Sequence, residues 1–281
     1  MDIGIGLPTT VPGTPGADLV EFARRADERG FSTLAVLDRF VYDSYDSIVA
    51  LAAAATATKR IRIAATVLLA AYRPGIAELA KQLASVDRLS GGRLAVGVSA
   101  GGREDDFKVN GTRYSNRGRR LDALLEELTH IWSGADGGTG PRPERGEIPL
   151  WVGGHSEAAL RRAARSGSAW ISPGGTAARY PDLVARAEAA FAEAGRTERP
   201  HMVSLAYFAL GEQARGGDYL RDYYSYIGQK ADMLARGLLS TKEQIHETVA
   251  GFAEAGCDEL LFIPCTADPA QVDLLAEAAL A

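Results

Sequence analysis

The stretch that decides the fold lies between residues 61 and 111 and reads IRIAATVLLAAYRPGIAELAKQLASVDRLSGGRLAVGVSAGGREDDFKVNG. It opens with an apolar, β-branched strand at residues 61–65, which runs into the apolar segment 66–69. A helix begins after Pro74 and ends at a Gly-Gly pair, and a second strand follows at residues 94–98. The stretch therefore predicts a strand–helix–strand unit with small residues after its second strand.

The same alternation continues along the whole chain. We predict strands at residues 3–7, 33–37, 61–65, 94–98, 150–152, 169–172, 202–210 and 259–263. Strand-then-helix repetition indicates a parallel sheet, and eight units fit an α/β protein with a closed (β/α)8 TIM barrel. A doubly wound open sheet is the alternative, but it usually carries Gly-x-Gly-x-x-Gly in its first turn, whereas Gly4 and Gly6 lie inside the first strand.

We predict a single barrel domain over residues 1–281, with a helical insertion after the seventh strand at residues 218–236. Ser240 and Glu243 predict a capping box at the start of the helix that follows this insertion. The insertion carries four tyrosines, which we expect to cover the barrel mouth, to build a dimer interface or simply to pack between helices. These tyrosines are Tyr219, Tyr223, Tyr224 and Tyr226.

Composition excludes several classes of function. The net charge of −5 argues against a nucleic-acid partner, which needs a basic face. The densest basic group, Arg117, Arg119 and Arg120, is interpreted as a solvated helix face. The two cysteines, Cys257 and Cys265, form no Cys-x-x-Cys motif, and no grouping has metal-ligand spacing. With no signal peptide and no apolar run of membrane-spanning length, we expect a cytoplasmic enzyme.

In a parallel barrel, function is carried by the C-terminal ends of the strands. The second strand ends in Asp38-Arg39, which could position a substrate or hold a proton, or form a structural pair that orders the loop. The apolar segment 66–69 after the third strand could cover a flat aromatic ring system, or pack under its neighbours.

Small residues at Ser99, Ala100 and Gly101, after the fourth strand, allow a ligand to approach the backbone closely. The acids at 104–106 that follow could suggest Mg²⁺, but an exposed acidic helix start explains them more simply. The fifth strand ends in Gly153-Gly154-His155-Ser156 and leads into a helix, a pattern that suits an anion site as well as a plain helix cap.

Nucleophilic hydrolysis is poorly supported by this set of residues. Of the four histidines, only His155 falls at a predicted strand end, and no Gly-x-Ser-x-Gly motif is present. Few reactive side chains, apolar walls and an anion pocket suit a cofactor that carries the chemistry itself.

The sequence resembles the luciferase-like flavin monooxygenases along nearly its whole length. The most specific matching segments are LAKQLASVDRLSGGRLAVGVSAGG at residues 79–102 and PLWVGGHSEAALRRAA at residues 149–164. The resemblance implies that FMN, or the deazaflavin F420, binds at the barrel mouth. It also implies a non-proline cis peptide between Thr66 and Val67 that supports the flavin ring.

By the same resemblance, the cofactor contacts three positions after strand four, a phosphate-binding turn after strand five and two ring or tail positions on strand six. These are Ser99, Ala100 and Gly101; Gly153, Gly154, His155 and Ser156; and Ile171 and Ser172. The chain departs from the family at two places. Asp38-Arg39 stands where many members carry a histidine, and Gly101-Gly102 stands where F420-dependent sugar-phosphate dehydrogenases carry an acid.

The resemblance favours a monooxygenase that uses reduced FMN from a separate flavin reductase, together with O₂, on a small organic substrate. Asp38, Arg39 and Tyr42 could orient that substrate or relay a proton. An F420-dependent oxidoreductase performing hydride transfer is the first alternative, because cationic residues such as Arg73 and Arg103 would suit its longer anionic tail. A non-catalytic flavin-binding barrel is the second. We also expect a homodimer.

Overall fold

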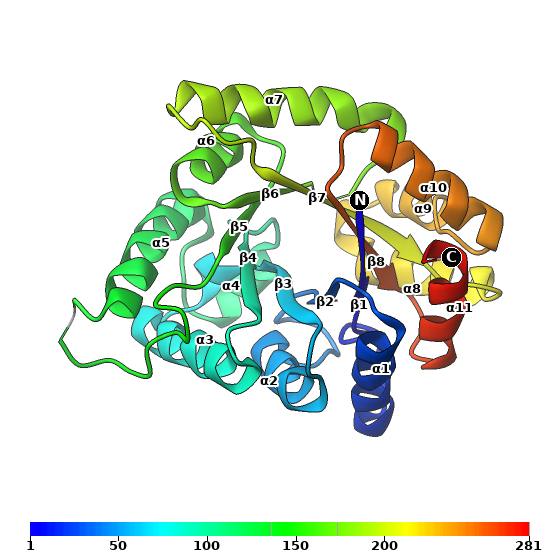
Figure 1. Ribbon diagram of the computed structural model, residues 1–281, viewed down its shortest axis with the longest axis horizontal. Helices are drawn as coiled ribbons and strands as arrows, with labels where there is room; N and C mark the ends of the chain where they lie inside the picture. The colour runs from blue at the N-terminus through cyan, green and yellow to red at the C-terminus, as the bar shows by residue number, and fades with distance from the viewer. Residues whose placement is uncertain (136, 173, 281) are drawn as a thin grey trace.

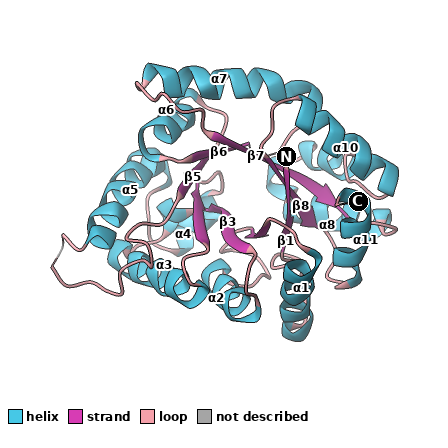
Figure 2. Cartoon of the chain, viewed as in Figure 1, coloured by secondary structure: helices cyan, strands magenta, loops and turns pink. Residues whose placement is uncertain are grey.

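The computed structural model describes residues 1–135, 137–172 and 174–280, and its strands close into one parallel barrel with helices around it (Figure 1, Figure 2). The predicted (β/α)8 architecture is therefore confirmed. The strands are β1 Asp2–Gly6, β2 Thr33–Val36, β3 Arg62–Leu68, β4 Leu94–Val98, β5 Leu150–Gly153, β6 Ala169–Ser172, β7 His201–Phe208 and β8 Glu259–Pro264.

Helices cover the outside of the barrel (Figure 1). The helices are α1 Gly16–Arg29, α2 Ser47–Ala57, α3 Ile76–Ser90, α4 Glu104–Val109, α5 Arg117–Ser133, α6 Glu157–Ser166, α7 Tyr180–Glu193, α8 Gln213–Tyr223, α9 Lys230–Arg236, α10 Lys242–Glu254 and α11 Ala270–Ala279. Strand β1 pairs with β8 in the register Asp2↔Glu259. Helix α1 lies beside α11 (Figure 1), where Arg25 pairs with Asp273 at 2.9 Å.

The two glycines of β1 are explained by the barrel interior. A Cβ atom on Gly4 would lie 2.3 Å from Cδ2 of Leu261, and one on Gly6 would lie 2.9 Å from Cδ1 of Ile263. These glycines therefore leave room for the β8 side chains that fill the barrel, because a barrel of this size is a packed core and not a pore.

Helix α5 corresponds to the segment of the sequence with the clearest helical periodicity of apolar residues. Its apolar residues Leu121, Leu124, Leu125, Leu128, Ile131 and Trp132 are all buried, as a helical repeat of 3.6 residues predicts. No helix among the described residues is long and apolar enough to cross a membrane. Both cysteines are buried and carry free thiols.

Two local predictions need correction. The insertion after β7 is not one helical stretch: α8 and α9 are separated by a 3-10 turn at Ser225–Ile227 and by Gly228, whose φ of 61° and ψ of −135° interrupt the helix. The capping box of α10 uses Thr241 and Gln244 instead of Ser240 and Glu243. Ser240 and Thr241 are adjacent hydroxyl residues, each followed at the right spacing by a Glu or Gln, so the spacing alone does not distinguish them.

Candidate functional site

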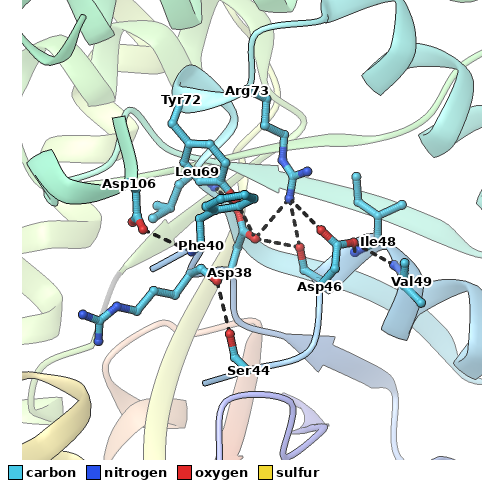
Figure 3. Close-up of polar contacts among 12 residues, drawn as sticks. Asp38, Phe40, Ser44, Asp46, Ile48, Val49, Leu69, Tyr72, Arg73 and Asp106 are labelled. Atoms are coloured by element: carbon cyan, nitrogen blue, oxygen red, sulfur yellow. Dashed lines mark hydrogen bonds and ion pairs between the residues drawn. The ribbon is translucent and has the colours of Figure 1, made fainter. Parts of the chain in front are cut away.

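Asp38 is the centre of a buried polar network at the end of β2 (Figure 3). Its carboxylate accepts hydrogen bonds from the Leu69 N–H at 2.9 Å and from the Ser47 hydroxyl at 2.8 Å. The Tyr72 hydroxyl and the Arg73 guanidinium approach it at 3.1 Å and 3.2 Å. Since both carboxylate oxygens are occupied, Asp38 joins the β2 end to the loop after β3.

The ionisation of this network is set by burial and by two ion pairs of Arg73, with Asp38 at 3.2 Å and with Asp46 at 3.7 Å. Burial, followed by the charge of Asp38, raises the pKa of Tyr72 well above its usual value. Burial lowers the pKa of Arg73, but the charges of Asp38 and its neighbours outweigh this effect and raise it overall. Asp38 therefore pairs with Arg73, and not with the adjacent Arg39.

Arg39 and Tyr42 lie behind the mouth and hold the insertion. Arg39 donates to the Tyr223 carbonyl at 3.0 Å, and its guanidinium lies 4.5 Å from the centre of the Tyr42 ring. Tyr42 donates a short hydrogen bond to Asp222. Both residues therefore connect the loop after β2 with helix α8.

Asp106 corrects the prediction of an exposed acidic helix start. Its side chain is fully buried and accepts hydrogen bonds from the Phe40 N–H at 3.1 Å and the Val41 N–H at 2.7 Å. Burial raises its pKa, and the backbone N–H of Val41 acts in the opposite direction. Helix α4 is thus fastened to the loop after β2 by one carboxylate.

The basic residues at the start of α5 are not merely a solvated face. Arg120 donates to the Ala71 carbonyl at 2.8 Å and to the Arg73 carbonyl at 2.7 Å. Arg117 donates to the Gly101 carbonyl at 3.0 Å. The helix therefore supports the loops after β3 and β4, which a local charge pattern could not reveal.

The segment after residue 65 of β3 has the geometry that the resemblance implied. The Thr66–Val67 peptide bond is cis, and the pairing of β3 with β4 shifts register between Ala65 and Leu68. Thr66 is buried, and Val67 lies so close to Gly153 that a Cβ atom there would come within 3.1 Å of Val67 Cγ1. The bulge and the end of β5 therefore meet at the mouth.

The loop after β4 is held close to this bulge. The Ser99 N–H donates to the Leu68 carbonyl at 3.0 Å, and the Ser99 hydroxyl accepts from the Gly101 N–H at 3.3 Å. Gly101 has a φ of 81°, and a Cβ atom on it would lie 3.3 Å from Phe107. Ala100 is half-buried and packs against the core.

Residues 153–156, here called the glycine turn, connect β5 to α6. The Gly154 N–H donates to the Ile171 carbonyl at 3.2 Å, and the Trp170 indole donates to the Gly154 carbonyl at 2.9 Å. The Ser156 hydroxyl caps α6 by accepting from the Ala159 N–H. Among the described residues, the N–H groups of His155 and Ser156 have no hydrogen-bond partner, so two donors at a helix N-terminus point to an anion.

His155 is surrounded by groups that suit the same anion. Its Nε2 lies 3.0 Å from the Ser172 hydroxyl, and Arg186 donates to its carbonyl at 2.9 Å. Desolvation, followed by the charges of Arg186 and Arg179, lowers the pKa of His155, so its neutral form is favoured near neutral pH. Ile171, in contrast, is buried in the barrel interior.

Two adjoining cavities open at the mouth. The first, the mouth cavity, has a volume of about 240 Å³ and lies over the ends of β2, β3, β4 and β7. Its walls are Leu37, Asp38, Thr66, Val67, Leu69, Ser99, Gly101, Gly102, Arg103, Leu205, Tyr207, Tyr223, Tyr224 and Tyr226. Arg39 and Tyr42 are not among them. The sequence-predicted residues Asp38, Thr66, Val67, Ser99 and Gly101 are thus brought together.

The second, the side cavity, has a volume of about 860 Å³ and extends from His155 between the loop after β6 and helices α9 and α10. It is mostly apolar, with Arg179, Lys230 and Glu247 as its charged lining residues. Tyr207 and Tyr224 line both cavities and share a short hydrogen bond between their hydroxyls. This tyrosine pair is therefore a partition between the two cavities.

The tyrosines of the mouth are neutral hydrogen-bonding groups. Burial raises the pKa of Tyr223 to about 12, although Arg103 and Arg39 oppose this shift. Burial also raises the pKa of Tyr207 and Tyr224 well above its usual value. Each hydroxyl consequently keeps its proton at neutral pH.

Arg103, one of the cationic residues expected around the mouth, lines the mouth cavity. It is buried, with its guanidinium 4.6 Å from the centre of the Tyr223 ring and 4.2 Å from that of Tyr226. One of its nitrogens, Nη1, has no hydrogen-bond partner among the described residues. Tyr207 was not predicted as a site residue. The only feature of the sequence that could have indicated it is its position near the end of the predicted seventh strand. Within the described ranges, no cluster of His, Cys, Asp or Glu could hold a metal ion.

This geometry defines a TIM-barrel protein whose mouth combines a glycine-rich turn at a helix N-terminus with an apolar, tyrosine-covered pocket. The chain belongs to the luciferase-like monooxygenase family, which it matches over residues 1–256. It is 26% identical over 295 residues to an FMNH₂-dependent dimethylsulfone monooxygenase of Pseudomonas fluorescens, covering 86% of this chain and 80% of that protein.

A second relative uses the other cofactor. An F420-dependent glucose-6-phosphate dehydrogenase of Amycolatopsis mediterranei is 26% identical over 224 residues, which cover 70% of this chain and 67% of that protein. A solved F420-dependent secondary alcohol dehydrogenase has a TM-score of 0.84 at 18% identity, covering 100% of this chain and 99% of that one, and supports the fold alone. Relatives of this chain thus include both FMN-dependent and F420-dependent enzymes.

Proposed function

We propose that the protein is an F420-dependent oxidoreductase that acts on a small organic substrate at the barrel mouth. The observation that carries this proposal is the side cavity. It continues from the glycine turn and offers two cations, Arg179 and Lys230, against one carboxylate, Glu247. FMN ends at its phosphate, whereas F420 continues beyond its phosphate into an anionic tail that needs such a space.

The residues present fit such a cofactor. The free N–H groups of His155 and Ser156 would hold the phosphate at the start of α6. Gly153 and Gly154 let the turn pack closely against Val67 and Ala159, which would set the position of these donors. Thr66 and Val67 would support the ring from below, with Ser99, Ala100 and Gly101 at its side and Ile171 and Ser172 toward the glycine turn. When bound, F420 supplies two-electron hydride transfer, while the protein supplies binding and orientation.

The substrate would lie in the mouth cavity beneath the tyrosines. Tyr207, Tyr223 and Tyr224 remain protonated. One hydroxyl of the Tyr207–Tyr224 pair donates to the other, so the accepting hydroxyl and that of Tyr223 can donate hydrogen bonds to a substrate oxygen. The rings also exclude water from the reacting atoms. Asp38, Arg39 and Tyr42, which were predicted as catalytic, would act as positioning residues, because their polar atoms hold the surrounding loops.

The second candidate is the monooxygenase that the sequence favoured, with reduced FMN, O₂ and a separate flavin reductase. The enclosed apolar wall of the mouth cavity supports it, because Leu37, Val67, Leu69 and Leu205 would shield a reactive flavin from water. The third candidate function is a barrel that binds a flavin but catalyses no reaction.

Side-by-side titration of the purified apoprotein with FMN and F420, in both redox states, separates these candidates. We expect tighter binding of F420 than of FMN, and reduction or oxidation of a substrate in the absence of O₂. Exclusive binding of FMN with turnover that requires O₂ would overturn the F420 proposal in favour of the monooxygenase. If a cofactor binds but no carbonyl or alkene substrate tested is converted, the result would favour a flavin-binding barrel without catalytic activity.

The glycine turn can be tested separately. A Cβ atom on Gly154 would lie 2.9 Å from the Cβ of Ala159, and Gly154 has a φ of 127° that a β-branched residue cannot adopt without strain. We expect Gly154→Val to weaken cofactor binding by about tenfold or more, equivalent to about 1.4 kcal/mol. Unchanged affinity in a variant with native circular dichroism and melting temperature would refute phosphate binding at this turn. Gly146→Val, at an exposed loop glycine, serves as the control.

A further inference from the structure

The opposite end of the barrel holds a third cavity, here called the basal pocket, with a volume of about 500 Å³. It lies where several strands begin: Arg62 is the first residue of β3, Leu94 of β4 and His201 of β7. No part of the proposed cofactor site is involved, because that site lies at the C-terminal strand ends.

The basal pocket is cationic in a chain whose net charge is −5. Four arginines line it: Arg60, Arg62, Arg93 and Arg145. Among the described residues, no carboxylate lines it. Four carboxylates lie nearby, and each is already engaged. Asp27 accepts hydrogen bonds from the N–H groups of Lys59, Arg60 and Ile61, and Asp87 accepts from the Glu144 N–H. Glu259 is fully buried and held by Ser32, Thr33, Arg62 and His201. Glu144 pairs with Arg88.

The arginines differ in how much hydrogen-bonding capacity remains. Arg93 donates to five oxygens, all of them from hydroxyls or backbone carbonyls, so its charge is held in place without a carboxylate partner. Arg145 is exposed, and among the described residues its guanidinium makes no hydrogen bond or ion pair, although its charge interacts with that of Asp87. It lies over Gly92, where a Cβ atom would be 3.2 Å from its Nε. Arg145 therefore offers a complete guanidinium to a ligand.

Arg60 and Arg62 offer further donors. Arg60 uses one nitrogen to donate to the Asp27 carbonyl at 2.6 Å. Arg62 uses Nη1 for Glu259 and Thr33, while its guanidinium lies 5.6 Å from the centre of the Trp151 ring. Their remaining N–H groups, with those of Arg145, surround one concavity. Guanidinium groups bind phosphate and carboxylate oxygens in pairs, and a recess strengthens the attraction relative to an open surface.

We propose that the basal pocket binds a small multivalent oxyanion, carrying phosphate or several carboxylates. This site is independent of the proposed redox function. It would stabilise the N-terminal end of the barrel, where separate strands and loops supply the arginines, and would couple the concentration of that anion to the stability of the fold.

Calorimetric titration with inorganic pyrophosphate and with citrate, at about 0.15 M salt, tests the proposal. We expect saturable binding of at least one of them, and a loss of affinity of about tenfold or more in the double variant R60Q/R145Q. Both side chains are exposed, so this variant is expected to fold, and the single variant R145E gives the same test with one change. The matched control R215Q/R221Q removes two exposed arginines elsewhere and should bind as the native protein does.

The glycine turn could also take up an anion, so the titrations are repeated in Gly154→Val. Retained binding in this variant, with loss in R60Q/R145Q, supports the basal pocket. Tighter binding of pyrophosphate than of citrate assigns a phosphate ligand, and the reverse assigns a polycarboxylate. The absence of saturable binding, equal binding in R60Q/R145Q, or loss only in Gly154→Val would overturn the proposal.

Discussion

The two sides of the barrel mouth are held together by different physical means. On the side of β2 and β3, a buried carboxylate, Asp38, is bonded to Leu69, Tyr72 and Arg73. On the side of β7, the insertion is held over the mouth by aromatic rings against the Arg39 and Arg103 guanidinium groups and by hydrogen bonds to the Tyr223 carbonyl. Hydrogen bonds from Tyr42 to Asp222 and between Tyr207 and Tyr224 add to these contacts. We call the first side the wall, because a buried charge network fixes it, and the second side, formed by the insertion, the cover, because its contacts are individually weak.

The largest effect is expected on the wall. Asp38→Asn leaves the buried Arg73 with only the more distant and more exposed Asp46 as a charged partner, and we expect it to lower the free energy of unfolding by about 3 kcal/mol. Chemical denaturation measures this loss. Asp43→Asn, at an exposed acid in the same loop, should change stability by less than about 0.5 kcal/mol. Equal stabilities of the two variants would show that the wall is no stronger than the cover.

A smaller effect is expected when the cover loses its central cation. Arg103→Met keeps a long apolar stem but removes the charge from the Tyr223 and Tyr226 rings, and we expect a loss of about 2 kcal/mol. The loss should be accompanied by faster proteolysis of residues 223–230. Arg221→Met, at an exposed arginine on α8, is the control. If Arg103→Met destabilises as much as Asp38→Asn, the distinction between wall and cover fails.

Alkaline pH should loosen the cover through Tyr223. Its pKa is raised from 10 to about 12 in the folded protein, so the unfolded chain loses this proton first as the pH rises. The resulting stability is present below pH 10 and is lost between pH 10 and 12, with about 1.4 kcal/mol gone at pH 11. Denaturation at pH 9 and pH 11, compared with Tyr223→Phe, measures it. An identical pH dependence in that variant would contradict the assignment.

The smallest effect concerns the outer edge of the cover. Tyr42→Phe removes the hydroxyl that donates to Asp222, and we expect a loss of about 1 kcal/mol or less, because the pair is partly exposed. A double-mutant cycle with Asp222→Asn isolates the interaction. A coupling energy near zero would mean that this contact does not hold the insertion.

The elements that could be predicted from sequence are those whose signal is local. The eight strands, the apolar face of α5 and the glycine turn follow from periodicity and from residue types at short spacing. The cis Thr66–Val67 bond followed from the resemblance. The ion pair of Asp38 with Arg73 could not be predicted from the sequence, because Arg73 lies on another loop while Arg39 is adjacent in the chain.

The rest depended on contacts between distant segments. Asp106 is buried only because the N–H groups of Phe40 and Val41 reach it. The tyrosines were recognised as a group, but the pairing of Tyr224 with Tyr207 requires the insertion to fold back on β7. The cationic side cavity forms from the same folding back, and it is the observation on which we propose F420, whereas the sequence favoured FMN.

The pairing of β1 with β8 has a consequence for how the protein is made. Residues 2–5 of β1 are synthesised before the rest of the barrel, yet their partners on one side are residues 259–262 of β8, its last strand. Throughout synthesis, the nascent sheet therefore keeps two unpaired edges, each able to pair with another chain. We therefore expect translation speed and chaperone supply to govern the yield of native protein more strongly than the stability of the finished barrel does. Pulse labelling of nascent chains on stalled ribosomes can measure when the barrel closes.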